Sequence, residues 1–140
     1  MKILWNKKFQ ILFFLLFIWL IFYGIYEIES LEKRKKITIG KITGTKNSKG
    51  TLITYSYKID SVSYRKKYRI GYSDFEGTSR SDPFSYNDVH KYLLNKKFPV
   101  IYDSLDFFNS DILILEKDFI RYKLPYPDSL NWTKDILKTK

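Results

Sequence analysis

The sequence predicts a mainly β protein with one N-terminal transmembrane helix: a small antiparallel β-barrel or sandwich of about five strands, plus one or two short helices. Three observations support this. A run of eighteen residues near the N-terminus is apolar and uncharged. Two later segments alternate apolar and polar side chains, which is typical of half-buried strands. The chain also contains twelve Tyr and eleven Phe, residue types that favour strands and fill a small core.

The apolar run covers residues 9–26, and Gln10 is its only strongly polar side chain. As a helix it spans about 27 Å, close to the ~30 Å hydrocarbon core of a bilayer. It ends in FYGIY, whereas a cleaved signal peptide needs small residues there, so we expect an uncleaved signal anchor. Residues 1–8 form a tail, and residues 27–36 a charged juxtamembrane spacer or a helical extension of the anchor.

The charges around the run give two opposing indications of orientation. Lys7 and Lys8 precede the run and Glu27 and Glu29 follow it, which favours a cytoplasmic tail and a β-domain on the extracytoplasmic side of the cell membrane. The basic run at residues 33–36 argues for the reverse. We favour the first orientation because its charges lie closest to the anchor and the tail is short.

The clearest local structure is a hairpin of strands at residues 52–59 and 62–72, joined by Asp60-Ser61. A two-residue loop places residue 59 opposite 62 and residue 57 opposite 64, which puts both apolar sets on one face. Lys66 is the only exception to the pattern. A strand at residues 37–44 precedes the hairpin, and its Gly40 is expected to mark a β-bulge.

The rest of the chain contains shorter elements. Ser85 followed by an acid three residues later predicts a capped helix, which Asn95 can close in the left-handed region. The β-domain is expected at residues 37–116 and a C-terminal tail, extended at Pro125 and Pro127, at residues 117–140. The predicted elements are a polar loop at 73–81, a helix at 86–94, strands at 98–103 and 111–116, and a helix at 130–137.

The β-domain carries the excess positive charge of the chain. The net charge is +10, and residues 1–29 contribute three Lys and two Glu, which leaves 22 basic and 13 acidic residues. The hairpin directs four of its cations away from the tyrosines, a pattern that suits anionic lipid headgroups or serves only solubility. The absence of aromatic side chains from this face argues against nucleic acid. The candidate anionic-surface contacts are Lys58, Arg65, Lys67, Arg69, Lys33, Arg34, Lys35 and Lys36.

Catalytic constellations are sparse. The chain has no Cys, and His90 is its only histidine, which excludes thiolate and paired-histidine chemistry; we expect His90 on a helix surface. Asp103, Asp106 and Asp111 come close together, but their spacing does not match a calcium loop. Their expected role is capping of backbone amides in turns. We therefore predict no catalytic, metal or cofactor site.

The order of motifs resembles a bacterial family of uncharacterised membrane-anchored domains. The family signature runs T-x-G-x-I, Y-x-Y-x-V-x-G-x-Y and V-x-Y-[DN]-P, followed by Asn and Ser. This chain has TIGKI at residues 38–42, YSYKID followed by Tyr64, and VIYDS at residues 100–104, with Asn109 and Ser110 after it. The resemblance covers residues 37–116 and implies a small β-domain on one or more transmembrane helices, without any activity.

The chain departs from the family pattern at three turns. Asp60 stands in place of the hairpin Gly, Ser104 in place of Pro, and Phe107-Phe108 in place of a further Pro-like position. These departures concern loop geometry more than the fold.

Three functions remain open. The first is an interaction module that binds another envelope protein through a sheet edge or the loop at residues 106–109. The second is electrostatic docking on anionic lipid. The third is an enzyme acting on an envelope substrate through Asp103, Asp106 and Asp111, which we rank last because these carboxylates are expected to cap backbone amides.

Overall fold

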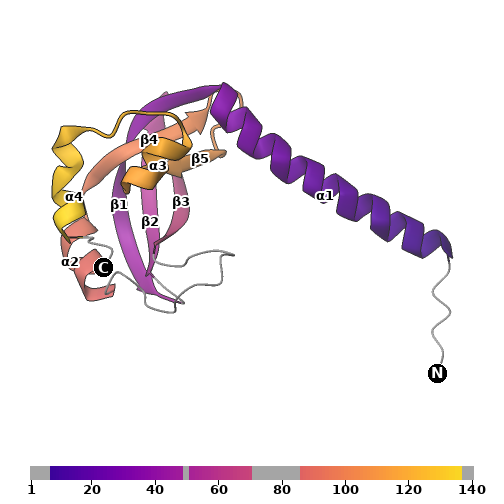
Figure 1. Ribbon diagram of the computed structural model, residues 1–140, viewed down its shortest axis with the longest axis horizontal. Coiled ribbons are helices and arrows are strands. Elements are labelled where there is room, and N and C mark those ends of the chain that lie inside the picture. Colours follow the sequence, from indigo (N-terminus) through magenta and orange to yellow (C-terminus); the bar gives the residue numbers. More distant parts are fainter. Residues whose placement is uncertain (1–6, 49–50, 71–85, 137–140) are drawn as a thin grey trace.

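The structure is a computed structural model that describes residues 7–48, 51–70 and 86–136. It consists of a long helix, α1 (Lys7–Lys33), that projects from a curled sheet with short helices around it (Figure 1). The fold class expected from the sequence is confirmed: the chain is mainly β, with one N-terminal apolar helix and a five-stranded antiparallel half-barrel.

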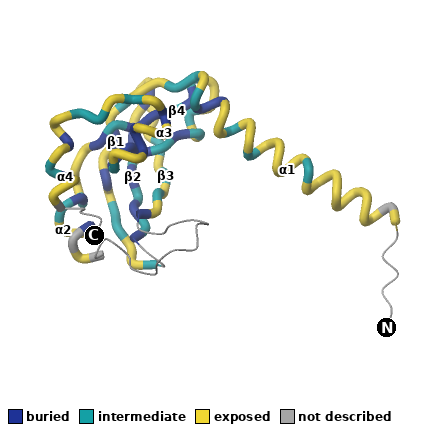
Figure 2. The backbone as a smooth tube through the Cα atoms, viewed as in Figure 1, coloured by how far each residue is buried: buried dark blue, intermediate teal, exposed yellow. Residues whose placement is uncertain are grey.

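Most of α1 has no protein around it. Its large apolar side chains from Phe9 to Ile28, Ile18 excepted, are about half exposed or more, and exposure continues along its length in Figure 2. Within the described residues, one helix is long and apolar enough to cross a membrane, over Phe9–Lys33. A soluble helix would expose this surface to water at a large hydrophobic cost.

No separate spacer connects α1 to the sheet. The helix continues through the charged residues to Lys33, and the first strand, β1 (Lys35–Asn47), begins two residues later. Residues 27–36 are therefore helix and strand, which confirms the helical extension and corrects the expected spacer.

The sheet has the strand order β3-β2-β1-β4-β5, and every neighbouring pair is antiparallel. It curls so that its inner face encloses one apolar core (Figure 1). The other strands are β2 (Thr51–Ile59), β3 (Val62–Ile70), β4 (Lys97–Asp103) and β5 (Ser110–Ile112).

The hairpin register expected from the sequence is confirmed. Ile59 pairs with Val62 and Tyr57 with Tyr64. Asp60 and Ser61 have φ values of 48° and 70°, which is the left-handed pair of a type I′ turn and matches the right-handed twist of the strands.

The bulge expected at Gly40 is wrong. The register of β1 against β2 shifts between Ile42 and Gly44, two residues further on. Gly40 instead pairs regularly on both sides, and a Cβ atom there would lie 2.5 Å from Val100 Cγ2. Gly40 is thus required because the Val100 side chain of the neighbouring strand β4 lies close to its Cα atom.

The short helix after the hairpin is confirmed as α2 (Tyr86–Leu93), and Asn95 follows it with a φ of 65°. The cap expected at Ser85 and the loop at 73–81 lie outside the described residues. The predicted strand at 111–116 is too long, because β5 ends at Ile112. Leu113 and Ile114 are buried but lie outside the strand, and Glu116 begins a helix.

The C-terminal segment is part of the core and not a peripheral tail. It forms α3 (Glu116–Arg121), a 3-10 turn η1 (Asp128–Leu130) and α4 (Asn131–Ile136), and the last two confirm the expected final helix. Phe119, Tyr122 and Leu130 are buried. The folded domain therefore extends well beyond residue 116.

Candidate functional site at the helix exit

The junction between α1 and the sheet is held by one buried ion pair. Arg34 Nε and Nη2 donate to the two carboxylate oxygens of Asp103, at 2.8 and 2.5 Å. Asp103 is fully buried, and its Oδ1 also accepts the N–H of Leu105 at 2.9 Å. The Arg34 guanidinium, more than the amide, holds the pKa of Asp103 well below its usual range. A bidentate pair of this kind fixes direction as well as distance.

A second set of contacts ties α1 to the loop between β4 and β5, next to Asp103. Asn109 Nδ2 donates to the Glu27 carbonyl at 2.8 Å and lies 3.1 Å from Ser30 Oγ. Leu31 is buried against the domain. Together with the Arg34 pair, these contacts hold the last two turns of α1 against the connection between β4 and β5.

A third tie comes from the segment after α3. Lys35 Nζ donates to the Tyr122 carbonyl at 2.7 Å, and Lys123 forms an ion pair with Glu32 at 2.5 Å. The Glu32 carboxylate raises the pKa of Lys123. The helix and the start of β1 are thus held on the domain by contacts from two separate segments, residues 103–109 and residues 122–123.

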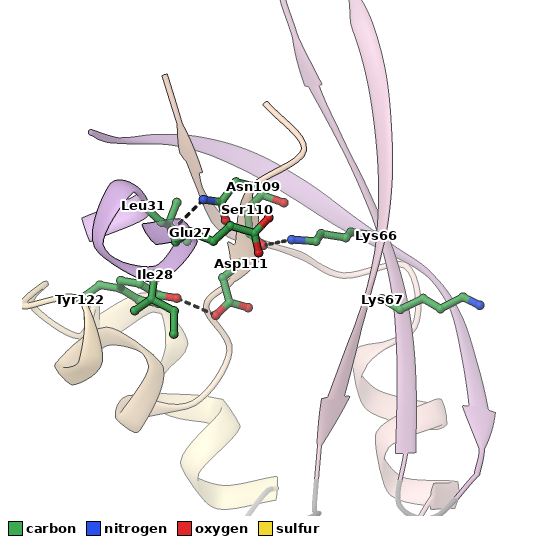
Figure 3. Close-up of a pocket in the computed structure, with 9 residues that line it drawn as sticks. All are labelled: Glu27, Ile28, Leu31, Lys66, Lys67, Asn109, Ser110, Asp111 and Tyr122. Carbon is green, nitrogen blue, oxygen red and sulfur yellow. Dashed lines mark hydrogen bonds between the residues drawn. The ribbon is translucent and has the colours of Figure 1, made fainter. Parts of the chain in front are cut away.

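A cavity of about 230 Å³ lies at this junction, between the end of α1, the middle of β3 and the edge strand β5 (Figure 3). In Figure 3 Lys66 points into the cavity and Lys67 points away from it. The lining residues are Glu27, Ile28, Leu31, Lys66, Lys67, Asn109, Ser110, Asp111 and Tyr122.

The cavity sits on the seam of the half-barrel, where side chains replace strand pairing between β3 and β5. Lys66 Nζ donates to the Ser110 carbonyl at 2.8 Å. The hydroxyl of Tyr57 donates to the Phe107 carbonyl at 2.6 Å, and the Tyr55 hydroxyl lies 3.3 Å from Ser110 Oγ. Burial raises the pKa of the Tyr55 hydroxyl, so it remains a neutral donor. Lys66 breaks the hairpin pattern because it bridges this seam.

The cavity combines both signs of charge with an apolar wall. Burial raises the pKa of Asp111, although the Tyr122 hydroxyl donates to its carboxylate at 2.9 Å. Lys66 and Glu27 supply opposite charges at the rim. Such a mixture suits a ligand with a charged head and an apolar part. The described residues contain no group of three side chains that could hold a metal ion.

The cations predicted on the hairpin do lie together. Lys58, Arg65, Lys67 and Arg69 are all exposed on the outer face. Arg69 also donates to the Ser48 carbonyl. We call this group the hairpin cations.

The juxtamembrane cations are divided between structural and exposed positions. Arg34 and Lys35 hold the junction, as described above. Lys33 pairs with Glu29 at 3.3 Å in a well-exposed ion pair, and Lys36 is exposed. The four residues therefore do not form one free basic patch.

The three aspartates considered for catalysis have separate hydrogen-bond partners. Asp103 and Asp106 each accept the N–H two residues later, from Leu105 and Phe108, which confirms the expected turns. Asp111 is engaged with Tyr122. His90 is exposed on α2, with its Nδ1 2.6 Å from Thr45 Oγ1.

The sequence did not predict that Tyr122 and Asn109 lie at the junction with α1. Tyr122 lay in a segment considered peripheral, and no local signal distinguishes it. Asn109 was assigned only to a motif and a loop, although its amide joins that loop to α1.

No protein-family model, curated protein or solved structure matches the chain.

Proposed function

We propose that α1 spans a membrane once and that the half-barrel is an interaction module held at the membrane surface, where it binds another envelope protein. The rigid mounting of the domain on α1 carries this proposal. An anchor that only tethers a domain needs no more than a flexible linker. Here one residue separates helix from strand, and its guanidinium is bound by a buried carboxylate. Such a mounting is useful when the domain must meet its partner in one orientation.

The outer edge of β3 is the contact we propose. Among the described strands, β3 pairs with β2 alone. In a two-residue hairpin the pair beside the loop is hydrogen-bonded and the pairs then alternate, so Ser63, Arg65 and Lys67 direct their backbone groups outward. Lys66 bridges the middle of this edge to β5, so we place the contact at the turn end, beside Ser63, where a partner segment can add to the edge. The exposed cations at this edge favour an acidic segment.

Site-specific photo-crosslinking in cells tests this contact. A photoreactive residue at Ser63 in the full chain should give a discrete adduct with another protein, and the same residue at the exposed Lys97 on β4 should not. Arg65→Glu should weaken the Ser63 adduct. If both positions react equally, or neither gives an adduct, the proposed contact is wrong.

Docking on anionic lipid is the second candidate, and one observation favours it. Lys67 borders the same cavity as Ile28, and its exposed side chain points away from that cavity (Figure 3). The middle of β3 therefore lies near the end of the apolar run of α1, where an exposed cation is attracted to anionic headgroups. With an environment-sensitive dye at Ser63→Cys in nanodiscs, anionic lipid should change the emission, and salt or Lys67→Glu should reverse the change. If the dye emits at the same wavelength in neutral and anionic nanodiscs, docking on anionic lipid is wrong.

The proposal places the half-barrel on the extracytoplasmic side of a bacterial cell membrane, with α1 as an uncleaved signal anchor. It is supported by Lys7 and Lys8 before the apolar run and by Glu27 and Glu29 after it. A reporter fused to the C-terminus should be active only in the extracytoplasmic compartment. Membership of the resembled membrane-anchored family is part of the same proposal, and it rests on the order of the short motifs at residues 38–110.

A further inference from the structure

The loop between β4 and β5 displays two large apolar side chains. Leu105 is 77% exposed, more than any other large apolar residue in the described part of the chain, and Phe108 is 67% exposed. Between them, Phe107 is turned inward against Tyr64 and Tyr102. The loop thus packs the half-buried ring of Phe107 against the domain and exposes Leu105 and Phe108.

This presentation is fixed by hydrogen bonds. Asp103 Oδ1 accepts the N–H of Leu105 at 2.9 Å, and Asp106 Oδ1 accepts the N–H of Phe108 at 3.1 Å. The Phe108 ring also meets Tyr64 edge to face, with centroids 5.2 Å apart. The two side chains are therefore held outward by the turn geometry.

The loop lies beside the part of α1 that leaves the apolar run. Asn109, at the end of the loop, donates to the carbonyl of Glu27, the first residue after the run. Asn109 also lies 3.1 Å from Ser30 Oγ, about one turn further along the helix. At a rise of about 1.5 Å per residue, Glu27 and Ser30 lie within ~6 Å of the end of the run, which is the level of the interface if α1 spans a bilayer.

We propose that Leu105 and Phe108 insert into the membrane interface next to α1 and form a second lipid contact of the domain. The inference rests on the proposed function, because it requires that α1 spans the bilayer. The bilayer is the occupant we assign since the loop is continuous with the helix surface that the bilayer covers. The Asp106 carboxylate beside them limits the insertion to the headgroup and upper acyl region, where it stays hydrated.

The natural absence of cysteine allows a direct test with single-cysteine variants of the full chain in proteoliposomes. An environment-sensitive dye is attached at Leu105→Cys, Phe108→Cys, or the control Lys46→Cys. Lys46 is exposed and lies eleven residues along β1 from the junction, about 36 Å away if the strand is extended. Lipids with a nitroxide at the headgroup or the upper acyl chain act as quenchers.

The dyes at Leu105→Cys and Phe108→Cys should emit at shorter wavelength than the dye at Lys46→Cys and lose fluorescence with the shallow quenchers. Emission like that of the control would overturn the inference. A blue shift without lipid quenching would also overturn it, because a protein surface would then cover the loop.

A dye at Leu16→Cys, in the middle of the apolar run, separates this inference from the proposal beneath it. Quenching at Leu16→Cys by deep nitroxides, with none at the loop positions, would reject only the loop contact. No quenching at Leu16→Cys would reject the membrane span and the loop contact together.

Discussion

Gly40→Ala is expected to destabilise the half-barrel, although it adds only one methyl group. The new Cβ would lie 2.5 Å from Val100 Cγ2 and 3.3 Å from the Ser56 carbonyl oxygen. Carbon atoms in contact normally stand about 3.5–4.0 Å apart, so the overlap with Val100 is about 1 Å. Val100 is fully buried and its branched side chain has few alternative rotamers.

Overpacking of this kind costs about 1–3 kcal/mol. For a domain of about a hundred residues, this lowers Tm by roughly 4–24 °C. The loss of backbone freedom in the unfolded chain offsets a part of this, since Ala stabilises relative to Gly by about 0.5–1 kcal/mol where the backbone allows it.

Near-UV circular dichroism of the full chain in detergent measures this melting through the buried tyrosines. Gly44→Ala is the matched control in the same strand, because its Cβ would meet nothing closer than Thr54 Cβ at 3.7 Å. Val100→Ala removes the atom that the new Cβ would meet. Gly40→Ala should therefore lower Tm less in a chain that carries Val100→Ala than in the chain with intact Val100. Equal Tm values for Gly40→Ala and Gly44→Ala would refute the close-packing argument.

Three further predictions concern the junction and the seam. Arg34 lowers the pKa of Asp103, so this group stabilises the fold above its unfolded pKa of about 3.9 and loses that effect progressively as the pH falls towards its folded pKa. Asp103→Asn should therefore lower Tm at pH 7 and lower it less near pH 2. Burial raises the pKa of Asp111, so its ionisation opposes folding as the pH rises. Asp111→Asn should therefore leave Tm at pH 7 unchanged or higher, and a large decrease in Tm would contradict the assigned environment. Tyr57→Phe removes a donor to the Phe107 carbonyl and should cost about 0.5–1.5 kcal/mol in chemical unfolding, whereas an unchanged midpoint would mean that this hydroxyl does not stabilise the seam.

The parts of the fold that could be predicted are those determined by neighbouring residues. The hairpin follows from alternation and a two-residue turn, and the helix after it from a short periodic face. The long apolar run is decided by length and composition alone. In each case the determining interactions lie within a few residues of one another in the chain.

The parts that could not be predicted depend on residues far apart in the sequence. Gly40 is required because the Val100 side chain lies against it, and Arg34 binds Asp103, which is 69 residues away in the chain. The run DILILE was ambiguous, because a continuous apolar stretch shows burial but not pairing. Only its first two residues belong to β5.

The candidate site was visible only in part. The hairpin cations could be placed because a strand has a period of two residues. Their relation to α1 depends on the curl of the sheet, which brings Lys66 to Ser110. No local pattern specifies that curl.

The proposed function depends most on the rigid mounting of the half-barrel on α1. A distance measurement tests this mounting directly. Spin labels at Leu16→Cys in α1 and Lys46→Cys in β1 report the separation of the two parts in proteoliposomes by double electron–electron resonance. A single narrow distribution is expected, and Arg34→Ala should broaden it. A broad distribution in the chain with intact Arg34, unchanged by Arg34→Ala, would mean that the domain swings freely on its anchor and would contradict the account.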